Sequence, residues 1–78
     1  MPTVLIVDGY RFFFYANENN EPAHIHVQQG RNLAKFWLST IACAKSTGFS
    51  PTELNKLAKL VAQNQSIFER AWNEFFNA

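Results

Sequence analysis

Apolar runs alternate with short turn signals along the first part of the chain, a pattern typical of β-hairpins. Residues 3–7 form a β-branched run, and residues 10–16 form a second run rich in aromatic side chains. Asp8-Gly9 between them predicts a two-residue type I′ turn, which needs positive φ at both central positions. The predicted facing pairs are Val7 with Tyr10, Leu5 with Phe12 and Val4 with Phe13. Both faces of this hairpin are apolar, so we expect both to be covered.

A second hairpin follows a polar loop at residues 17–22. Residues 23–29 alternate with period two, and residues 32–38 form the returning strand. Gly30-Arg31 fits a type II′ turn, with glycine at its first central position. The predicted facing pairs are Gln29 with Asn32, Val27 with Ala34, His26 with Lys35, Ile25 with Phe36, and His24 with Trp37. Ile25, Val27, Ala34, Phe36 and Leu38 then point to the core, whereas His24, His26, Lys35 and Trp37 share the other face.

The C-terminal part changes to a helical pattern. Residues 39–48 are ambiguous between a short strand and a helical turn, and Gly48 ends them. Ser50-Pro51-Thr52-Glu53 then predicts a helix start with a capping box, and apolar residues follow at helical spacing to Phe75. A continuous helix over 51–76 would be about 39 Å long, longer than a globule of about 30 Å. We therefore expect it to overhang or to bend near residues 63–66, where Ser66 could cap a second segment.

These elements predict an α+β fold: an antiparallel sheet of two β-hairpins (ββββ) followed by one long or kinked C-terminal helix at about 51–76. The chain of 78 residues suits one domain, residues 1–78. A single cysteine, Cys43, excludes an internal disulfide and favours a reducing compartment. We find no signal-peptide core and no stretch long enough to span a bilayer. A cytoplasmic location without membrane contact is expected.

Charge and composition narrow the classes of partner. The formal net charge is +1, which excludes the strongly basic balance of a dedicated DNA binder but leaves a local RNA contact open. Aromatic residues make up 15% of the chain, with 8 Phe, 2 Trp and 2 Tyr, more than so small a core is expected to hide. The surplus predicts a homodimer or partner interface. Its candidate residues are Phe13, Tyr15, Trp72 and Phe76.

The face that carries His24, His26, Lys35 and Trp37 is the candidate for chemistry, with Glu21 in the loop just before it. Metal binding is one hypothesis, because both rings of a His-x-His strand point the same way. It supplies only two ligands where a site needs three or four, with Glu21 or Glu18 as a further one. We expect neither a metal nor another cofactor.

Metal-independent cleavage of RNA is the second hypothesis. His24 and His26 are the candidate acid and base, because the ordinary pKa of histidine lies closest to neutrality. Lys35 or Arg31 could stabilise charge on the phosphorane, and Trp37 or Tyr10 could stack a base. The third hypothesis is a half-exposed sheet face or a protein interface without catalysis.

Five short motifs carry a family resemblance. They are MPTVLIVDGYRFFFY at 1–15, EPAHIHV at 21–27, AKFWL at 34–38, GFS at 48–50 and WNEFF at 72–76. In this order they resemble, over essentially the whole chain, the small bacterial family catalogued as domain of unknown function 4160. That family often has Pro-Pro-His where this chain has Pro22-Ala23-His24, so the loop entering the strand is expected to be less rigid here.

The resemblance implies a protein partner. Members are typically encoded beside a second small protein of the domain-of-unknown-function 2442 type, and the pair is regarded as a type II toxin–antitoxin module. This chain would be the toxin-like member, with an antitoxin-like neighbour as partner. The resemblance transfers no catalytic residue, because the family's activity is unknown. Two functions remain: a toxin acting on RNA, or a non-enzymatic module that forms a homodimer or a complex with the neighbour.

Overall fold

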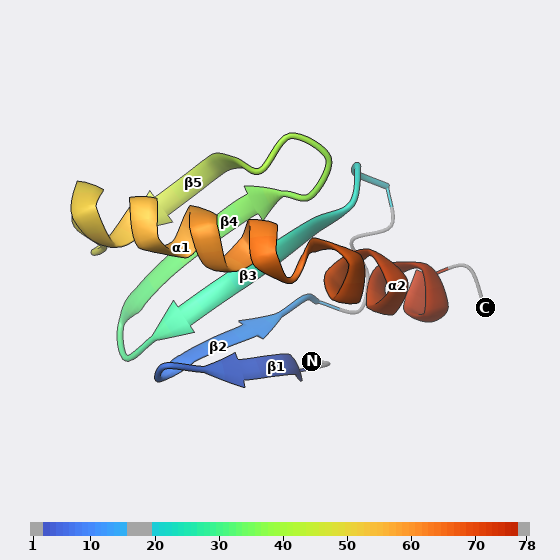
Figure 1. The fold of residues 1–78 in the computed structure, drawn as a ribbon, viewed down its shortest axis with the longest axis horizontal. Coiled ribbons are helices and arrows are strands. Elements are labelled where there is room, and N and C mark those ends of the chain that lie inside the picture. Colours follow the sequence, from blue (N-terminus) through green and yellow to red (C-terminus); the bar gives the residue numbers. More distant parts are fainter. Residues whose placement is uncertain (1–2, 16–19, 77–78) are drawn as a thin grey trace.

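A five-stranded antiparallel sheet carries two helices on one of its faces (Figure 1). The structure is a computed structural model that describes residues 3–15 and 20–76. The strands follow chain order as β1 (Thr3–Val7), β2 (Tyr10–Phe13), β3 (His24–Gln29), β4 (Asn32–Trp37) and β5 (Ala42–Thr47), and the helices are α1 (Pro51–Gln63) and α2 (Gln65–Phe76). The predicted α+β class and antiparallel sheet are confirmed, with one strand more than predicted and with two helices in place of one.

The first hairpin has the predicted turn and most of the predicted register. Asp8 and Gly9 take φ values of 53° and 82°, as a type I′ turn requires. Two of the three predicted facing pairs, at Val7 and at Leu5, are confirmed. The third was wrong, because a β-bulge near Val4 brings Thr3 opposite Phe13. The second strand of this hairpin is shorter than predicted, ending at Phe13.

The second hairpin follows its predicted register throughout. All five predicted pairs between β3 and β4 are present, and Gly30 has the positive φ of its turn position. The ambiguous segment after it becomes a strand, β5, which pairs with β4 at the edge of the sheet. Every residue of β5 is exposed, so its sequence lacks the apolar alternation that would have identified it.

The helical region begins as predicted and breaks in its middle. Ser50 is the N-cap of α1, and its capping box with Glu53 is complete. α1 ends at Gln63 with Asn64 as its C-cap, and α2 begins at once at Gln65. Ser66 therefore lies inside α2 and is not its cap. The predicted bend is confirmed, and the molecule measures 35 × 22 × 21 Å.

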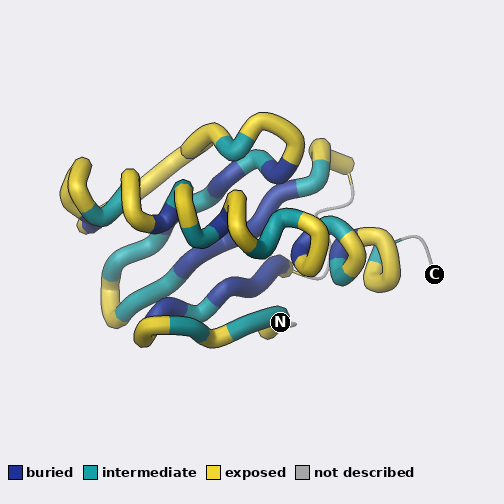
Figure 2. Tube along the Cα trace, viewed as in Figure 1, coloured by how far each residue is buried: buried dark blue, intermediate teal, exposed yellow. Residues whose placement is uncertain are grey.

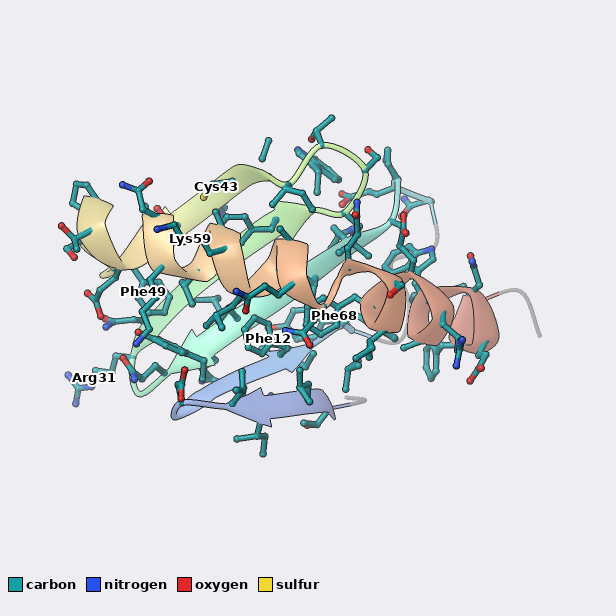
Figure 3. All side chains as sticks on the ribbon, viewed as in Figure 1. Phe12, Arg31, Cys43, Phe49, Lys59 and Phe68 are labelled. Carbon is teal, nitrogen blue, oxygen red and sulfur yellow. The ribbon has the colours of Figure 1, made fainter. Side chains whose placement is uncertain are left out.

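The hydrophobic core lies between the helices and the central strands (Figure 2). Phe12 of β2 stacks on Phe68 of α2 with ring centroids 5.2 Å apart (Figure 3). The predicted core positions of β3 and β4 are all buried: Ile25, Val27, Ala34, Phe36 and Leu38. α1 and α2 contribute Leu57, Val61, Phe68 and Trp72. Among the described residues, no helix is long and apolar enough to cross a membrane.

Candidate functional site

The sheet face opposite the helices carries a row of directly facing side chains. Phe13 of β2 faces His26 of β3, His26 faces Lys35 of β4, and Lys35 faces Lys45 of β5. A parallel row holds Arg11, Gln28, Leu33 and Thr47. Strand alternation separates both rows from the core, because their sequence neighbours such as Phe12 and Val27 point to the helices. We call these eight residues the open face.

A hollow of about 150 Å³ lies on the open face, and we call it the sheet pocket. It is lined by Tyr15, His26, Leu33, Ala34, Lys35, Lys45 and Thr47. The hollow is mostly apolar, with Leu33 and Ala34 in its lining, and five of its lining residues carry an ammonium, imidazole or hydroxyl group at the end of the side chain. This donor set suits an anion, because ammonium and hydroxyl groups both hydrogen-bond to phosphate or carboxylate oxygens.

His26 is fixed by aromatic neighbours at the edge of the sheet pocket. Its ring stacks on Phe13 at 5.4 Å and meets the edge of Tyr15 at 4.8 Å. The residue is 7% exposed, so only a small part of the ring is accessible, and it lines the pocket. An imidazole that lines a pocket can exchange a proton with a group bound there.

His24 lies beside His26 but is sealed from solvent. Its exposure is 0%, and its ring contacts that of Trp72 at 4.9 Å and that of Trp37 at 5.7 Å. Nδ1 lies 2.9 Å from the Pro22 carbonyl oxygen, to which it donates. The ring of His24 also meets that of His26 at right angles, 5.1 Å away. The two histidines are together as predicted, but His26 is the one that lines the pocket.

Lys35 connects the pocket to the loop before β3. Its Nζ donates to Glu21 Oε1 at 2.6 Å and lies 4.7 Å from the centre of the Trp37 ring. The same carboxylate oxygen is 3.7 Å from His24 Nδ1. Glu21 thus lies against both Lys35 and His24, and Trp37 contacts the same two residues. Its charge also competes with any anion that approaches Lys35.

Two predicted binding residues lie elsewhere. Tyr10 is on the helix side of the sheet and 4% exposed, packed on Phe49 with ring centroids 6.1 Å apart. Its position in β2 is an even number of residues from Phe12, so strand alternation turns it to the core. Arg31 lies at the tip of the β3–β4 turn (Figure 3) and is not one of the residues that line the sheet pocket.

The aromatic residues predicted for a partner interface occupy different environments. Phe13 is buried on the open face, Trp72 is buried in the core, and Phe76 packs partly against that core. Tyr15 is 36% exposed and borders the sheet pocket. The fold thus uses most of these rings internally. Other large apolar side chains are more exposed, namely Ile6, Ile67 and Phe75.

The sequence prediction missed Lys45 and Thr47. Both belong to β5, which the sequence left ambiguous. A signal existed: once residues 42–47 are paired with β4, Lys45 falls opposite Lys35 and joins the His26 row. For metal binding, no group of three or more His, Cys, Asp or Glu side chains suited to an ion exists in the described parts of the chain. Glu18, the other ligand considered, lies outside the described residues.

Comparison with protein-family models gives a match over residues 9–73 to a family described as "Domain of unknown function (DUF4160)". No curated protein and no solved structure matches the chain significantly.

Proposed function

The chain belongs to the DUF4160 family, and from this premise we propose that it is the toxin-like member of a bacterial type II toxin–antitoxin module, acting on RNA in the cytoplasm as a metal-independent endoribonuclease. One observation carries the proposal: His26 lines a pocket that Lys35 and Lys45 also line. An acid–base group and two cations are what cleavage at a phosphodiester requires.

The proposed reaction uses the ribose 2′-hydroxyl as the nucleophile. His26 takes the proton from this hydroxyl as its oxygen attacks the adjacent phosphorus. The ammonium groups of Lys35 and Lys45 stabilise the negative charge of the phosphorane. Tyr15 lines the same pocket, and its hydroxyl is the proposed donor of a proton to the departing 5′-oxygen. The products are a 2′,3′-cyclic phosphate and a free 5′-hydroxyl end.

In this proposal His24 is a positioning residue. Its burial keeps it from the substrate, and its ring contact with His26 helps to fix the direction of the catalytic imidazole. Glu21 has a related role, because it holds Lys35 from one side. The proposed machinery thus keeps His26 and Lys35 of the sequence prediction, gives His24 a positioning role, and adds Lys45 and Tyr15.

The test is inducible expression of the chain in bacteria, with and without the protein encoded beside it, followed by RNA integrity on a gel. We expect growth arrest and RNA fragmentation, both relieved by the neighbour. His26→Gln and Lys45→Ala should remove both effects. Lys59→Ala, on the exposed side of α1 (Figure 3), removes the same charge far from the pocket and should change neither. Toxicity that persists in well-folded His26→Gln protein would contradict the proposal.

A second candidate function is a non-enzymatic interaction module that forms a homodimer or a complex with the neighbour-encoded protein. The exposed apolar surface supports this candidate, because Ile6 is 66% exposed and Phe75 is 45% exposed. Phe75 also borders a shallow hollow with Val4 and Ala71. This alternative predicts a stable complex or dimer with no RNA cleavage and no growth effect. A monomer in light scattering, combined with no binding to the neighbour, would exclude it.

A further inference from the structure

We infer that the sheet pocket receives one nucleotide of single-stranded RNA, with its phosphate between Lys35 and Lys45 and its base between Leu33 and the Tyr15 ring, which border the pocket from opposite ends. The inference rests on the proposed action on RNA and specifies the substrate class.

The lysine pair indicates where the phosphate binds. Lys35 and Lys45 face each other directly on neighbouring strands, where Cβ atoms are about 4.5–5.5 Å apart. Like charges in such a position repel and destabilise a sheet. A phosphate between them reverses this effect, because both ammonium groups can reach the oxygens of one phosphate.

The local charges leave Lys45 available for such an anion. Lys35 has Glu21 as a carboxylate partner at 2.6 Å. Lys45 is exposed and forms no ion pair with any described residue. The pair therefore carries one compensated and one uncompensated positive charge. An incoming phosphate adds the second negative charge that the two lysines can hold.

The rest of the pocket indicates what lies beside the phosphate. Leu33 and Ala34 give apolar lining, and Tyr15 and Thr47 line the pocket as well. Apolar and aromatic surface next to a phosphate site suits a nucleobase, which stacks on aromatic rings and hydrogen-bonds through its edge. The volume of about 150 Å³ limits the pocket to a group of the size of one base.

Only an unpaired strand can use both features. In an RNA duplex the bases are stacked inside the helix, and the deep major groove is closed to side chains, so no base can enter a pocket on a sheet. A double-stranded RNA-binding domain spans about 16 base pairs, whereas this molecule is 35 Å in its longest dimension and has few cations on its open face. A single strand with unstacked bases can place one phosphate and one base in the pocket.

Arg11 supplies a third cation on the same face, beside Lys35 and Lys45. It lies on β2, two strands from β4 and in the row of Leu33, two residues along the strand from Lys35, and the two Cα atoms are thus about 12 Å apart. Its guanidinium carbon lies 4.2 Å from the centre of the Phe13 ring, and its Nε and Nη2 are buried without a hydrogen bond in the part of the chain that the structure describes. At this distance Arg11 can contact a neighbouring phosphate of the same strand.

The test is fluorescence anisotropy of the purified chain with labelled six-nucleotide RNAs. Each ribose carries a 2′-O-methyl group, which blocks attack by the 2′-oxygen and separates binding from cleavage. We expect the single strand to bind at least about tenfold more tightly than the same sequence in a duplex. A single-stranded RNA that lacks the base at every second position should bind more weakly, because base–aromatic stacking contributes about 1–3 kcal/mol per base.

Variants locate the binding in the pocket. Lys45→Ala should weaken RNA binding and reduce the magnitude of the slope of log affinity against log salt concentration by about one. Lys45→Arg should keep the affinity and the slope of the unchanged protein. The control, Lys59→Ala, should match the unchanged protein. Equal or tighter duplex binding, full affinity for the abasic RNA, no RNA binding at all, or an unchanged affinity in Lys45→Ala each overturns the inference.

The two proposals fail separately. Single-strand binding at Lys45 without cleavage of the unmodified RNA contradicts the endoribonuclease and leaves the pocket inference standing. Cleavage of the unmodified RNA with a preference for duplex contradicts the inference and leaves the endoribonuclease standing.

Discussion

His24 and His26 are two residues apart on one strand, yet they differ in what each can reach. His26 lies in the middle of β3, where its ring packs against Phe13 and Tyr15 and lines the sheet pocket. His24 lies at the start of β3, where Trp72 of α2 packs against its ring. The sequence predicted their common face correctly from strand period. It could not predict their burial, because a residue 48 positions later closes over His24.

The histidine pair gives the first prediction. His24→Ala removes a fully buried ring and should lower the free energy of unfolding by about 2–4 kcal/mol. His26→Gln keeps a polar side chain of similar size and should leave the protein folded while reducing RNA cleavage by roughly 10²–10⁴-fold. Urea unfolding and a cleavage assay measure the two effects. A His24→Ala protein with unchanged stability would contradict the packing described here.

Glu21 gives the second prediction. Glu21→Gln removes the negative charge beside Lys35 but keeps an oxygen that accepts from its Nζ. Because the pair is partly exposed, stability should change by less than about 1 kcal/mol. RNA affinity should rise, by up to about fivefold, since Lys35 is then freer to contact phosphate. Glu74→Gln on α2 removes the same charge away from the pocket and serves as the control. Equal gains in both variants would point to overall charge and not to Lys35.

At the scale of elements, the residues of turns and helix caps predicted the positions of strands and helices better than the pattern of apolar residues did. Asp8-Gly9 and Gly30 fixed two hairpins, and Ser50 with Glu53 fixed the start of α1. β5 could not be identified in this way, since its six residues are small or polar and all exposed. Its position depends on pairing with β4, which is a tertiary property. Because β5 was not predicted, Lys45, one of the two lysines of the proposed phosphate site, was not predicted either.

The capping box gives the third prediction. Ser50 Oγ accepts from the Glu53 amide at 3.1 Å, and Glu53 Oε1 accepts from the Ser50 amide at 3.1 Å. Ser50→Ala should therefore destabilise the protein by about 1 kcal/mol. Thr52→Ala changes an exposed residue of the same helical turn and should stay within about 0.5 kcal/mol of the unchanged protein. Chemical denaturation compares them, and equal midpoints would show that the cap contributes nothing.

Two glycines give the fourth prediction. Gly30 has φ +59° with open space around it, whereas a Cβ on Gly48, at φ +90°, would collide with the Asn32 side chain. Gly30→Ala should cost about 1–2 kcal/mol from backbone conformation alone. Gly48→Ala should cost clearly more, because Asn32 must also move. Thermal unfolding of the two variants measures the difference, and a milder effect at Gly48 would contradict the close approach of Gly48 to β4.

At the scale of the whole molecule, helices cover one side of the sheet (Figure 1), and the other side carries His26, Lys35 and Lys45. The helical side builds the core from both hairpins and both helices. This division leaves the open face to bind a partner, and it places His26, Lys35 and Lys45 in one row across three strands. The division into two faces followed from the sequence. The pocket did not, because it needs β5 and Tyr15 in addition to the predicted hairpin.

The central claim is that His26 cleaves single-stranded RNA in the sheet pocket, and cleavage of a labelled single-stranded RNA by the purified chain tests it most directly. We expect fragments with a 2′,3′-cyclic phosphate, at the same rate with and without EDTA, and their loss in His26→Gln and Lys45→Ala but not in Lys59→Ala. An intact RNA after incubation with folded protein, or equal cleavage by the His26→Gln variant, would contradict the account.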